Sequence, residues 1–264
     1  MVQVKSKILY KQKITDKHFH LVIEGVSLIK DSCPGKFLEI KINDTNDPLL
    51  RRPFGIHRIQ GNKLGILFEV VGKGTQILAN KKAGEYLDII GPLGNGFEYR
   101  KTKDERRKTI LVAGGMGVAP LLFLAEKLAH SPQSMAHRKI MILLGAKTKE
   151  YILCEKEFRT LGCELKIATD DGSKGFKGKV TDLLKQFLTT HNSQLTTIYS
   201  CGPKLMLREL SVISGKHNIP AQLSLESHMA CGIGACLGCV VNTTQGFKRV
   251  CKEGPVFCAD EIVW

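Results

Sequence analysis

The sequence predicts a multi-domain protein in which an antiparallel β-barrel is followed by a doubly wound, parallel α/β domain and a small metal-binding module. Three observations support this fold class: short alternating strands fill residues 1–101, strands alternate with helices over 102–222, and cysteines crowd 223–264. The chain has 264 residues, which is enough to bury two cores and carry a small third unit. We therefore expect three units with these boundaries.

Residues 1–101 predict the barrel because their apolar residues alternate over short runs. Gly, Pro, Asn and Asp separate these runs, as is typical of strands joined by turns. A regular series of such strands predicts an antiparallel barrel. The predicted strands are KSKILYKQKI, HFHLVIEG, KFLEIKI, KLGILFEVVG and EYLDIIGPLG.

The rhythm changes after the charged connector YRKTKDERRK, at residues 99–108. The segment KTILVAGGMGVAPLLFLAEKLA reads as a buried strand, a glycine turn and an apolar helix. Strands alternating with helices predict a doubly wound parallel sheet. The further strands are RKIMILLGAK, CELKIATDD and QLTTIYSCGP, and the further helices are KVTDLLKQFLTT and KLMLRELSVISGKHN.

Charge and hydropathy exclude some classes of protein. The net charge of +14 would suit an acidic partner, but Lys and Arg are spread along the chain among acidic residues. We therefore predict no nucleic-acid partner. The basic charge would instead form a face for nucleotide phosphates or for an acidic partner subunit. The longest apolar stretch, 110–125, is short and broken by glycine and proline, so we predict no membrane span. The N-terminus lacks the apolar region of a signal peptide, so we expect a cytoplasmic protein.

The nine cysteines are an odd number without a secretory signal, which favours bound metal over a disulfide framework. The first three residues of Cys231-x4-Cys236-x2-Cys239-x11-Cys251 have the spacing of plant-type [2Fe-2S] ligands. The intervening glycines permit positive φ and let backbone N–H groups approach the sulfurs. A four-cysteine zinc site is the alternative, but such sites usually pair two C-x2-C knuckles, and only one occurs here.

The fourth ligand has two candidates. Cys251 follows a short predicted strand, from which a hairpin could return it to the other three cysteines. Cys258 also follows, and we expect it to be a packed thiol. Cys251 is therefore the predicted ligand.

A nucleotide site is predicted at LVAGGMGVAP, where a glycine turn joins a strand to a helix. Gly115, Gly117 and Pro120 would offer backbone N–H groups and a helix N-terminus to a pyrophosphate, although a close-packed turn also needs glycines. Cys201 ends another strand at the edge where such sheets bind ligands. It is a candidate catalytic residue near a nicotinamide, or a buried structural thiol. Asp170, or its neighbour in the turn TDDG, could bind a ribose hydroxyl and would favour NAD, or belong to an ordinary turn.

A second phosphate site is predicted within the barrel. Arg52, in RRPFGIHRI, stands at a strand start, where its guanidinium could clamp a flavin pyrophosphate. Gly74 and Thr75 open a short helix that would form a second phosphate cradle. Taken singly, each of these segments could also be an ordinary turn.

In this order the motifs resemble the ferredoxin–NADP reductase superfamily, through Arg52-Pro53-Phe54-Gly55, Gly74-Thr75, GGMGVAP and CGP. The cysteine module narrows the resemblance. ESHMACGIGACLGCVV and VCKEGPVF, with GPLGNGF and ATDDGSKGFKGKVT, closely resemble the electron-transfer subunits of class 1B dihydroorotate dehydrogenases. The resemblance covers nearly the whole chain, and its cysteine module is the most specific part.

The resemblance implies FAD on 1–101, NAD on 102–222 and a [2Fe-2S] cluster on 223–264. One departure is Gly55, where the superfamily usually has Ser or Thr close to the flavin ring. The implied FAD residues are Arg52, Pro53, Phe54, Gly55, Leu67, Phe68, Glu69, Gly74 and Thr75, and the implied cluster ligands are Cys231, Cys236, Cys239 and Cys251.

The resemblance also implies a function and a partner. Electrons would pass from the FMN of a dihydroorotate-oxidising catalytic subunit through [2Fe-2S] and FAD to NAD+, in pyrimidine (UMP) biosynthesis. The implied assembly is a heterotetramer of two plus two subunits. The alternatives are a related NAD(P)H reductase subunit of the ferredoxin or sulfide dehydrogenase type, and a zinc-stapled nucleotide-binding regulator without redox turnover.

Overall fold

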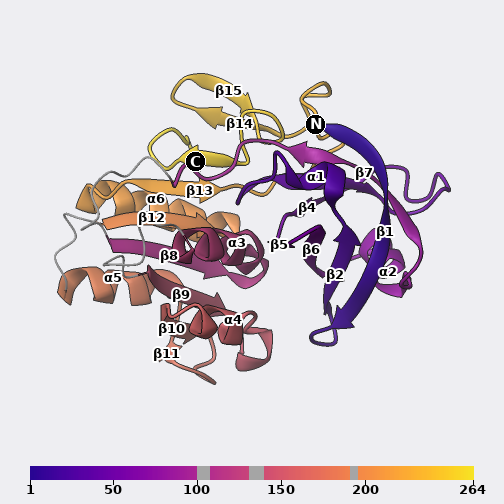
Figure 1. Cartoon of the computed structure of the whole chain (residues 1–264). Helices are drawn as coiled ribbons and strands as arrows, with labels where there is room; N and C mark the ends of the chain where they lie inside the picture. The colour runs from indigo at the N-terminus through magenta and orange to yellow at the C-terminus, as the bar shows by residue number, and fades with distance from the viewer. Residues whose placement is uncertain (100–107, 131–139, 191–195) are drawn as a thin grey trace.

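The computed structural model describes residues 1–99, 108–130, 140–190 and 196–264. The chain forms two seven-stranded sheets and a separate two-stranded hairpin. Figure 1 shows the curled N-terminal sheet beside the helix-flanked parallel sheet, with the C-terminal segment lying over both. The predicted fold class is confirmed. The predicted boundary between 101 and 102 lies outside the described residues.

The N-terminal sheet is antiparallel throughout, in the strand order β4-β3-β7-β1-β2-β6-β5. Its concave side holds one apolar core, because alternate residues such as Leu38 and Ile40 point inward and are fully buried. Two short helices, α1 (Val26–Ile29) and α2 (Lys73–Asn80), belong to this unit. The strands are β1 Val2–Lys13, β2 His18–Glu24, β3 Phe37–Lys41, β4 Arg52–Gly55, β5 Arg58–Gln60, β6 Lys63–Glu69 and β7 Tyr86–Leu93.

The second sheet has the order β11-β10-β9-β8-β12-β13-β16, and all of its neighbouring pairs except β13–β16 are parallel. Successive residues of β8 contribute to opposite faces, so Ile110 packs in one core and Leu111 in the other. Helix α3 packs on one face, and α5 and α6 on the other. The strands are β8 Lys108–Gly114, β9 Ile140–Ala146, β10 Glu164–Thr169, β11 Phe176–Lys177, β12 Thr196–Cys201, β13 Ala221–Ser224 and β16 Val256–Cys258. The α-helices are α3 Val118–Ala129, α4 Glu155–Thr160, α5 Val180–Thr190 and α6 Lys204–His217, with 3₁₀ turns η1 Gly115–Gly117 and η3 Lys149–Tyr151. Within the described ranges, none of these helices is long and apolar enough to cross a membrane.

The cysteine-rich segment is tied to the parallel sheet. It contains the hairpin β14 (Val240–Thr243) and β15 (Gly246–Arg249), and then β16 pairs antiparallel with β13. The predicted boundary between 222 and 223 falls inside β13. The last strand of the parallel sheet therefore gains its outer neighbour from the C-terminal segment, which covers an edge that would otherwise be open.

The two sheets meet along a seam on α3. Phe123 of α3 inserts into the core of the curled sheet, and Leu67 of β6 packs in the core of the parallel sheet. The His57 ring lies with Nδ1 2.9 Å from the carbonyl oxygen of Ala119, in the first turn of α3. These contacts hold the glycine turn before α3 against the curled sheet.

Candidate functional site

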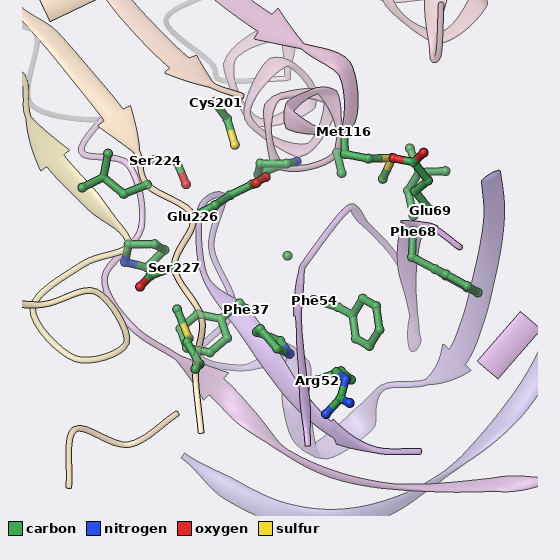
Figure 2. A pocket seen from close by; sticks show the side chains of 18 of the residues that line it. Phe37, Arg52, Phe54, Phe68, Glu69, Met116, Cys201, Ser224, Glu226 and Ser227 are labelled. Atoms are coloured by element: carbon green, nitrogen blue, oxygen red, sulfur yellow. The ribbon is translucent and has the colours of Figure 1, made fainter. Parts of the chain in front are cut away.

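A cavity of about 620 Å³ opens between the two sheets (Figure 2). Its size is in the range of small-molecule sites, about 300–1,000 Å³. Strands β4 and β6 form one wall, and the turn before α3 forms another. The end of β12 and residues 224–229, which follow β13, complete it.

The structure brings nearly all of the predicted FAD residues to this cavity. Eight of them line it: Arg52, Pro53, Phe54, Gly55, Leu67, Phe68, Glu69 and Thr75. The ninth, Gly74, packs against Arg52, since a Cβ on Gly74 would lie 3.0 Å from the Arg52 Nε atom. A guanidinium group thus lies beside the N-terminal turn of α2, whose first N–H groups have no partner within the helix. This arrangement fits a pyrophosphate.

Thr75 has a structural role within that cradle. Its Oγ1 accepts hydrogen bonds from the N–H groups of Val71 (2.9 Å) and Gly72 (3.2 Å), and donates one to the Gly72 carbonyl oxygen (3.0 Å). The hydroxyl therefore shapes the turn that precedes α2. The first backbone N–H groups of α2 itself have no acceptor within the helix and can bind an anion.

Gly55 leaves room for a larger side chain at the cavity wall. A Cβ at this position would meet only Pro120 Cδ, at 3.9 Å, which is ordinary van der Waals contact. The glycine therefore stands here without a steric requirement for it, and the position is open to a hydroxyl-bearing residue.

The nucleotide side of the cavity is built by two turns in backbone contact. A Cβ on Gly117 would lie 2.0 Å from the Cys201 carbonyl oxygen, so only glycine lets the turn after β8 meet the turn after β12. Gly115 has φ +52° and is exposed, with no heavy atom within 4 Å of a Cβ built there. Pro120 lines the cavity, whereas Asp170 lies outside it, exposed at the end of β10. Because these strands are parallel, both turns and Asp170 share one edge of the sheet.

Cys201 and Glu226 lie together at the far side of the cavity from Arg52 (Figure 2). Burial raises the pKa of Cys201 to about 12, so this group is a neutral thiol at physiological pH. Burial also raises the pKa of Glu226, although its side chain is accessible from the cavity. The neutral Cys201 thiol can pack against a ligand ring in the cavity, and the Glu226 carboxyl beside it is accessible to the same ligand.

Sequence reasoning missed the segment Ser224–Met229, which lines the cavity just before the first cluster cysteine. Only the position of this segment could have indicated the role: it begins at the last residue of β13, at the edge where parallel sheets bind ligands. Met116, in the turn before α3, was also missed.

The cluster loop, residues 231–239, directs backbone N–H groups at its own sulfurs. Ala235 and Cys236 donate to Cys231 Sγ at 3.3 and 3.4 Å, and Gly238 lies 3.5 Å from Cys236 Sγ. Positive φ at Gly232 (+67°) and Gly234 (+85°) makes this wrapping possible. Burial acts to raise the pKa of Cys231, but the surrounding N–H groups lower it to about 6. A thiol held in this way is ready to become a thiolate ligand.

The four predicted ligands fall into two adjoining pairs. Cys231 lies beside Cys236, and the N–H of Cys251 donates to Cys239 Sγ at 3.3 Å. In the parts of the chain that the structure describes, no three His, Cys, Asp or Glu side chains converge on a single metal ion. Two pairs of thiols with backbone N–H groups directed at their sulfurs fit the four cysteine ligands of a binuclear [2Fe-2S] cluster.

The hairpin β14–β15 carries Cys251 back to the loop, and the N–H of Val250 donates to the Cys239 carbonyl oxygen at 3.0 Å. Cys258 lies elsewhere, in β16 opposite Gln222. It is exposed, so the expectation of a packed thiol was wrong. The reason is that β16 is an edge strand whose alternate residues face outward.

One further residue belongs to this region. Glu39 in β3 is fully buried against the cluster loop, and burial raises its pKa to about 7. It lies outside every motif that the sequence analysis identified.

The fold is of the ferredoxin–NADP reductase type. One solved structure, described in work on flavin-based electron bifurcation by an NADH-dependent reduced ferredoxin-NADP oxidoreductase, is similar with a TM-score of 0.84. It has 30% identity, covering 98% of this chain and 90% of that one. The ferredoxin-NADP+ reductase from Plasmodium falciparum, at 19% identity, shares the fold, with a TM-score of 0.67 over 81% of this chain and 91% of that one.

Sequence relatives define the family more narrowly. Residues 226–263 match the iron-sulfur cluster binding domain of dihydroorotate dehydrogenase B, and residues 111–211 match an oxidoreductase NAD-binding domain. The dihydroorotate dehydrogenase B (NAD(+)) electron transfer subunit of Desulforamulus reducens is 38% identical, covering 98% of this chain and 97% of that protein. The corresponding subunit of Caldanaerobacter subterraneus subsp. tengcongensis is 40% identical, covering 99% of each. The chain belongs to the family of dihydroorotate dehydrogenase B electron transfer subunits.

Proposed function

We propose that this chain is the electron-transfer subunit of an NAD+-reducing dihydroorotate dehydrogenase in pyrimidine biosynthesis. It would accept electrons from the FMN of a catalytic partner subunit and deliver them to NAD+. Bound FAD exchanges electron pairs with the nicotinamide, and a [2Fe-2S] cluster carries one electron at a time. The protein's share is to hold these groups close together and to tune them.

The observation that carries the proposal is the continuity of the cavity. It runs from the predicted flavin residues past Pro120 and Cys201 to Met229, which stands two positions before Cys231. One cavity therefore joins the flavin wall, the nucleotide turns and the root of the cluster loop. Such an arrangement suits a subunit that passes electrons between three groups.

The chain's own residues have distinct tasks in this proposal. Arg52 and the N-terminus of α2 hold the flavin pyrophosphate, while Phe54 and Leu67 wall the ring site. The Gly117 and Cys201 turns position the nicotinamide, and Glu226 lines the cavity beside that site. Cys231, Cys236, Cys239 and Cys251 hold the cluster.

The surface around the cluster loop suits a protein partner. Ile233, Leu237 and Phe247 are 45%, 62% and 80% exposed, which is a high exposure for large apolar side chains grouped around one loop and its hairpin. We propose that the catalytic subunit covers this face, in a cytoplasmic heterotetramer of two plus two subunits.

The test is to purify the chain alone and together with its catalytic partner, and to follow NADH formation from dihydroorotate and NAD+. We expect NADH only when both subunits are present. Dihydroorotate oxidation by the chain alone would contradict the assignment. The Cys251→Ser variant should form no NADH in the complex, and Cys258→Ser is its matched control, because Cys258 lies in β16 and is not a predicted ligand.

The second candidate is a reductase subunit that serves another redox partner, such as ferredoxin. The 30% identical structure, whose title concerns a ferredoxin-NADP oxidoreductase, favours it. The 38–40% identity to dihydroorotate dehydrogenase subunits over the full length favours the first candidate. The two candidates are separated by mixing this chain with the dihydroorotate-oxidising subunit. NADH formation from dihydroorotate by that complex supports the first candidate, and its absence supports the second.

A further inference from the structure

Glu39 is a buried carboxyl group without a hydrogen-bond partner. Its side chain is 0% exposed, and neither Oε1 nor Oε2 has a hydrogen-bond partner. Leaving a buried polar group unpaired destabilises the folded protein, and a charged group does so more than a neutral one. Such a group calls for an explanation, and a ligand or a functional role supplies one.

The carboxyl lies directly beneath the cluster loop. A Cβ on Gly232 would come within 2.3 Å of Glu39 Cγ and 2.7 Å of Oε1, so the side chain fills the space under this glycine. In the sheet, Glu39 stands between Pro53 of β4 and Ile90 of β7. Glu39 therefore joins the cavity wall formed by β4 to the loop that carries the cysteines.

Among the residues that the structure describes, no counter-ion is bonded to this carboxyl. Arg51 pairs with Asp88 at 3.0 Å and also donates to the Asp88 carbonyl oxygen at 2.8 Å. Arg52 donates to the Leu50 carbonyl oxygen at 2.7 Å. Burial favours the protonated form of this carboxyl, the charges of Arg51 and Arg52 act in the opposite direction, and negative charge on a bound cluster would favour the protonated form further. The protonated group offers one O–H donor.

We propose that Glu39 is a positioning residue for the iron–sulfur cluster: held under Gly232 by the flavin barrel, it donates a hydrogen bond toward the sulfur atoms of the cluster and raises the cluster's reduction potential. Hydrogen bonds to the sulfurs stabilise the reduced, more negative state, which is why they raise the potential. The proposal rests on the cluster assignment made under Proposed function. The cluster would thus receive a polar contact from the flavin-binding sheet in addition to those from the N–H groups of the cluster loop.

The test compares two variants of the flavin- and cluster-loaded chain. Glu39→Gln keeps the shape and a donor, whereas Glu39→Met keeps the length and removes the donor. The electron paramagnetic resonance signal of the reduced cluster is followed during a potentiometric titration. At the potential where the wild-type cluster is half reduced, we expect Glu39→Met to lower the ratio of reduced to oxidised cluster at least tenfold, a shift of about 59 mV for a one-electron couple. Glu39→Gln and the surface control Glu24→Gln should stay within about twofold.

Two results would overturn the proposal. One is an unchanged ratio in Glu39→Met. The other is a tenfold rise in Glu39→Gln, because that is the effect of removing a buried negative charge. A wild-type chain without any cluster signal would overturn the cluster assignment together with this proposal, whereas an unchanged Glu39→Met variant overturns this proposal alone.

A second measurement covers the case in which Glu39→Met does not retain its cluster. The infrared difference spectrum between the wild type and Glu39→Gln should show the carbonyl stretch of a protonated carboxylic acid in the wild type only. Carboxylate bands in its place would overturn the proposal. This readout does not depend on enzymatic activity.

Discussion

His57 makes the stability of the molecule depend on pH. Its ring is 5% exposed at the seam between the two sheets, with Nδ1 2.9 Å from the Ala119 carbonyl oxygen. Burial is the main cause that lowers the pKa of His57 from 6.5 to about 3. The hydrogen bond to Ala119 acts in the opposite direction but does not offset burial.

The sign of the effect follows from the two pKa values. Between pH 6.5 and pH 3 the unfolded chain binds a proton at this histidine and the folded chain does not, so stability falls as the pH falls. Each pH unit below 6.5 costs about 1.4 kcal/mol. The free energy of unfolding should therefore drop by about 2 kcal/mol at pH 5, and by roughly 4 kcal/mol at pH 3.

The perturbation that isolates this effect is His57→Asn, which keeps an N–H donor near the position of Nδ1 and removes the titrating ring. Urea unfolding at pH 7.5 and pH 5.0 gives the free energy for each protein. We expect the wild type to lose about 2 kcal/mol more than the variant between these pH values. His20, whose ring centroid lies 5.3 Å away, is coupled to His57, so both proteins are compared in a His20→Asn background.

The matched control is His130→Asn, at an exposed position after α3. It should keep the pH dependence of the wild type. Equal losses of stability on acidification in His57→Asn and the wild type would show that His57 does not cause this pH dependence.

Three further predictions concern the candidate sites. Gly117→Ala should strongly lower the unfolding temperature, because its Cβ would lie 2.0 Å from the Cys201 carbonyl oxygen. Gly115→Ala should cost only about 1–2 kcal/mol of backbone strain, and thermal unfolding measures both effects. Cys251→Ser should lose the visible absorption of the cluster and Cys258→Ser should keep it, and equal spectra would contradict the ligand assignment. Arg52→Gln should weaken FAD binding about tenfold to a hundredfold, as measured by flavin fluorescence, because it removes a charge-assisted contact of roughly 1.5–3 kcal/mol.

Local signals in the sequence were sufficient for most of the fold. The glycine turn before α3 follows a continuous apolar strand, and the helix then runs from Val118 to Ala129 as its pattern predicts. Arg52 begins β4 and Gly74 lies in the first turn of α2, beside the proline and glycines that mark these positions in the sequence. In each case the physical cause lies within a few residues of its effect.

The strand β16 was not predictable in the same way. Its three residues, Val256–Cys258, are too few to show a period, and their role comes from pairing with β13 more than thirty positions earlier. That pairing also places Ser224–Met229 at the cavity, where no motif indicated a site. Pairing between distant segments depends on the whole fold, which a single sequence does not display.

Glu39 shows where pattern reasoning stops. In KFLEIKI, Leu38 and Ile40 alternate with Glu39 and Lys41, so the period of two correctly assigns Glu39 to the face away from the barrel core. On a solvated strand, a lone glutamate at such a position would be a surface residue. Here the cluster loop, almost two hundred residues later in the chain, covers that face and leaves the carboxyl 0% exposed under Gly232. The alternation predicts which way a side chain points, but the segment that arrives to cover it decides whether the residue meets water or a cofactor.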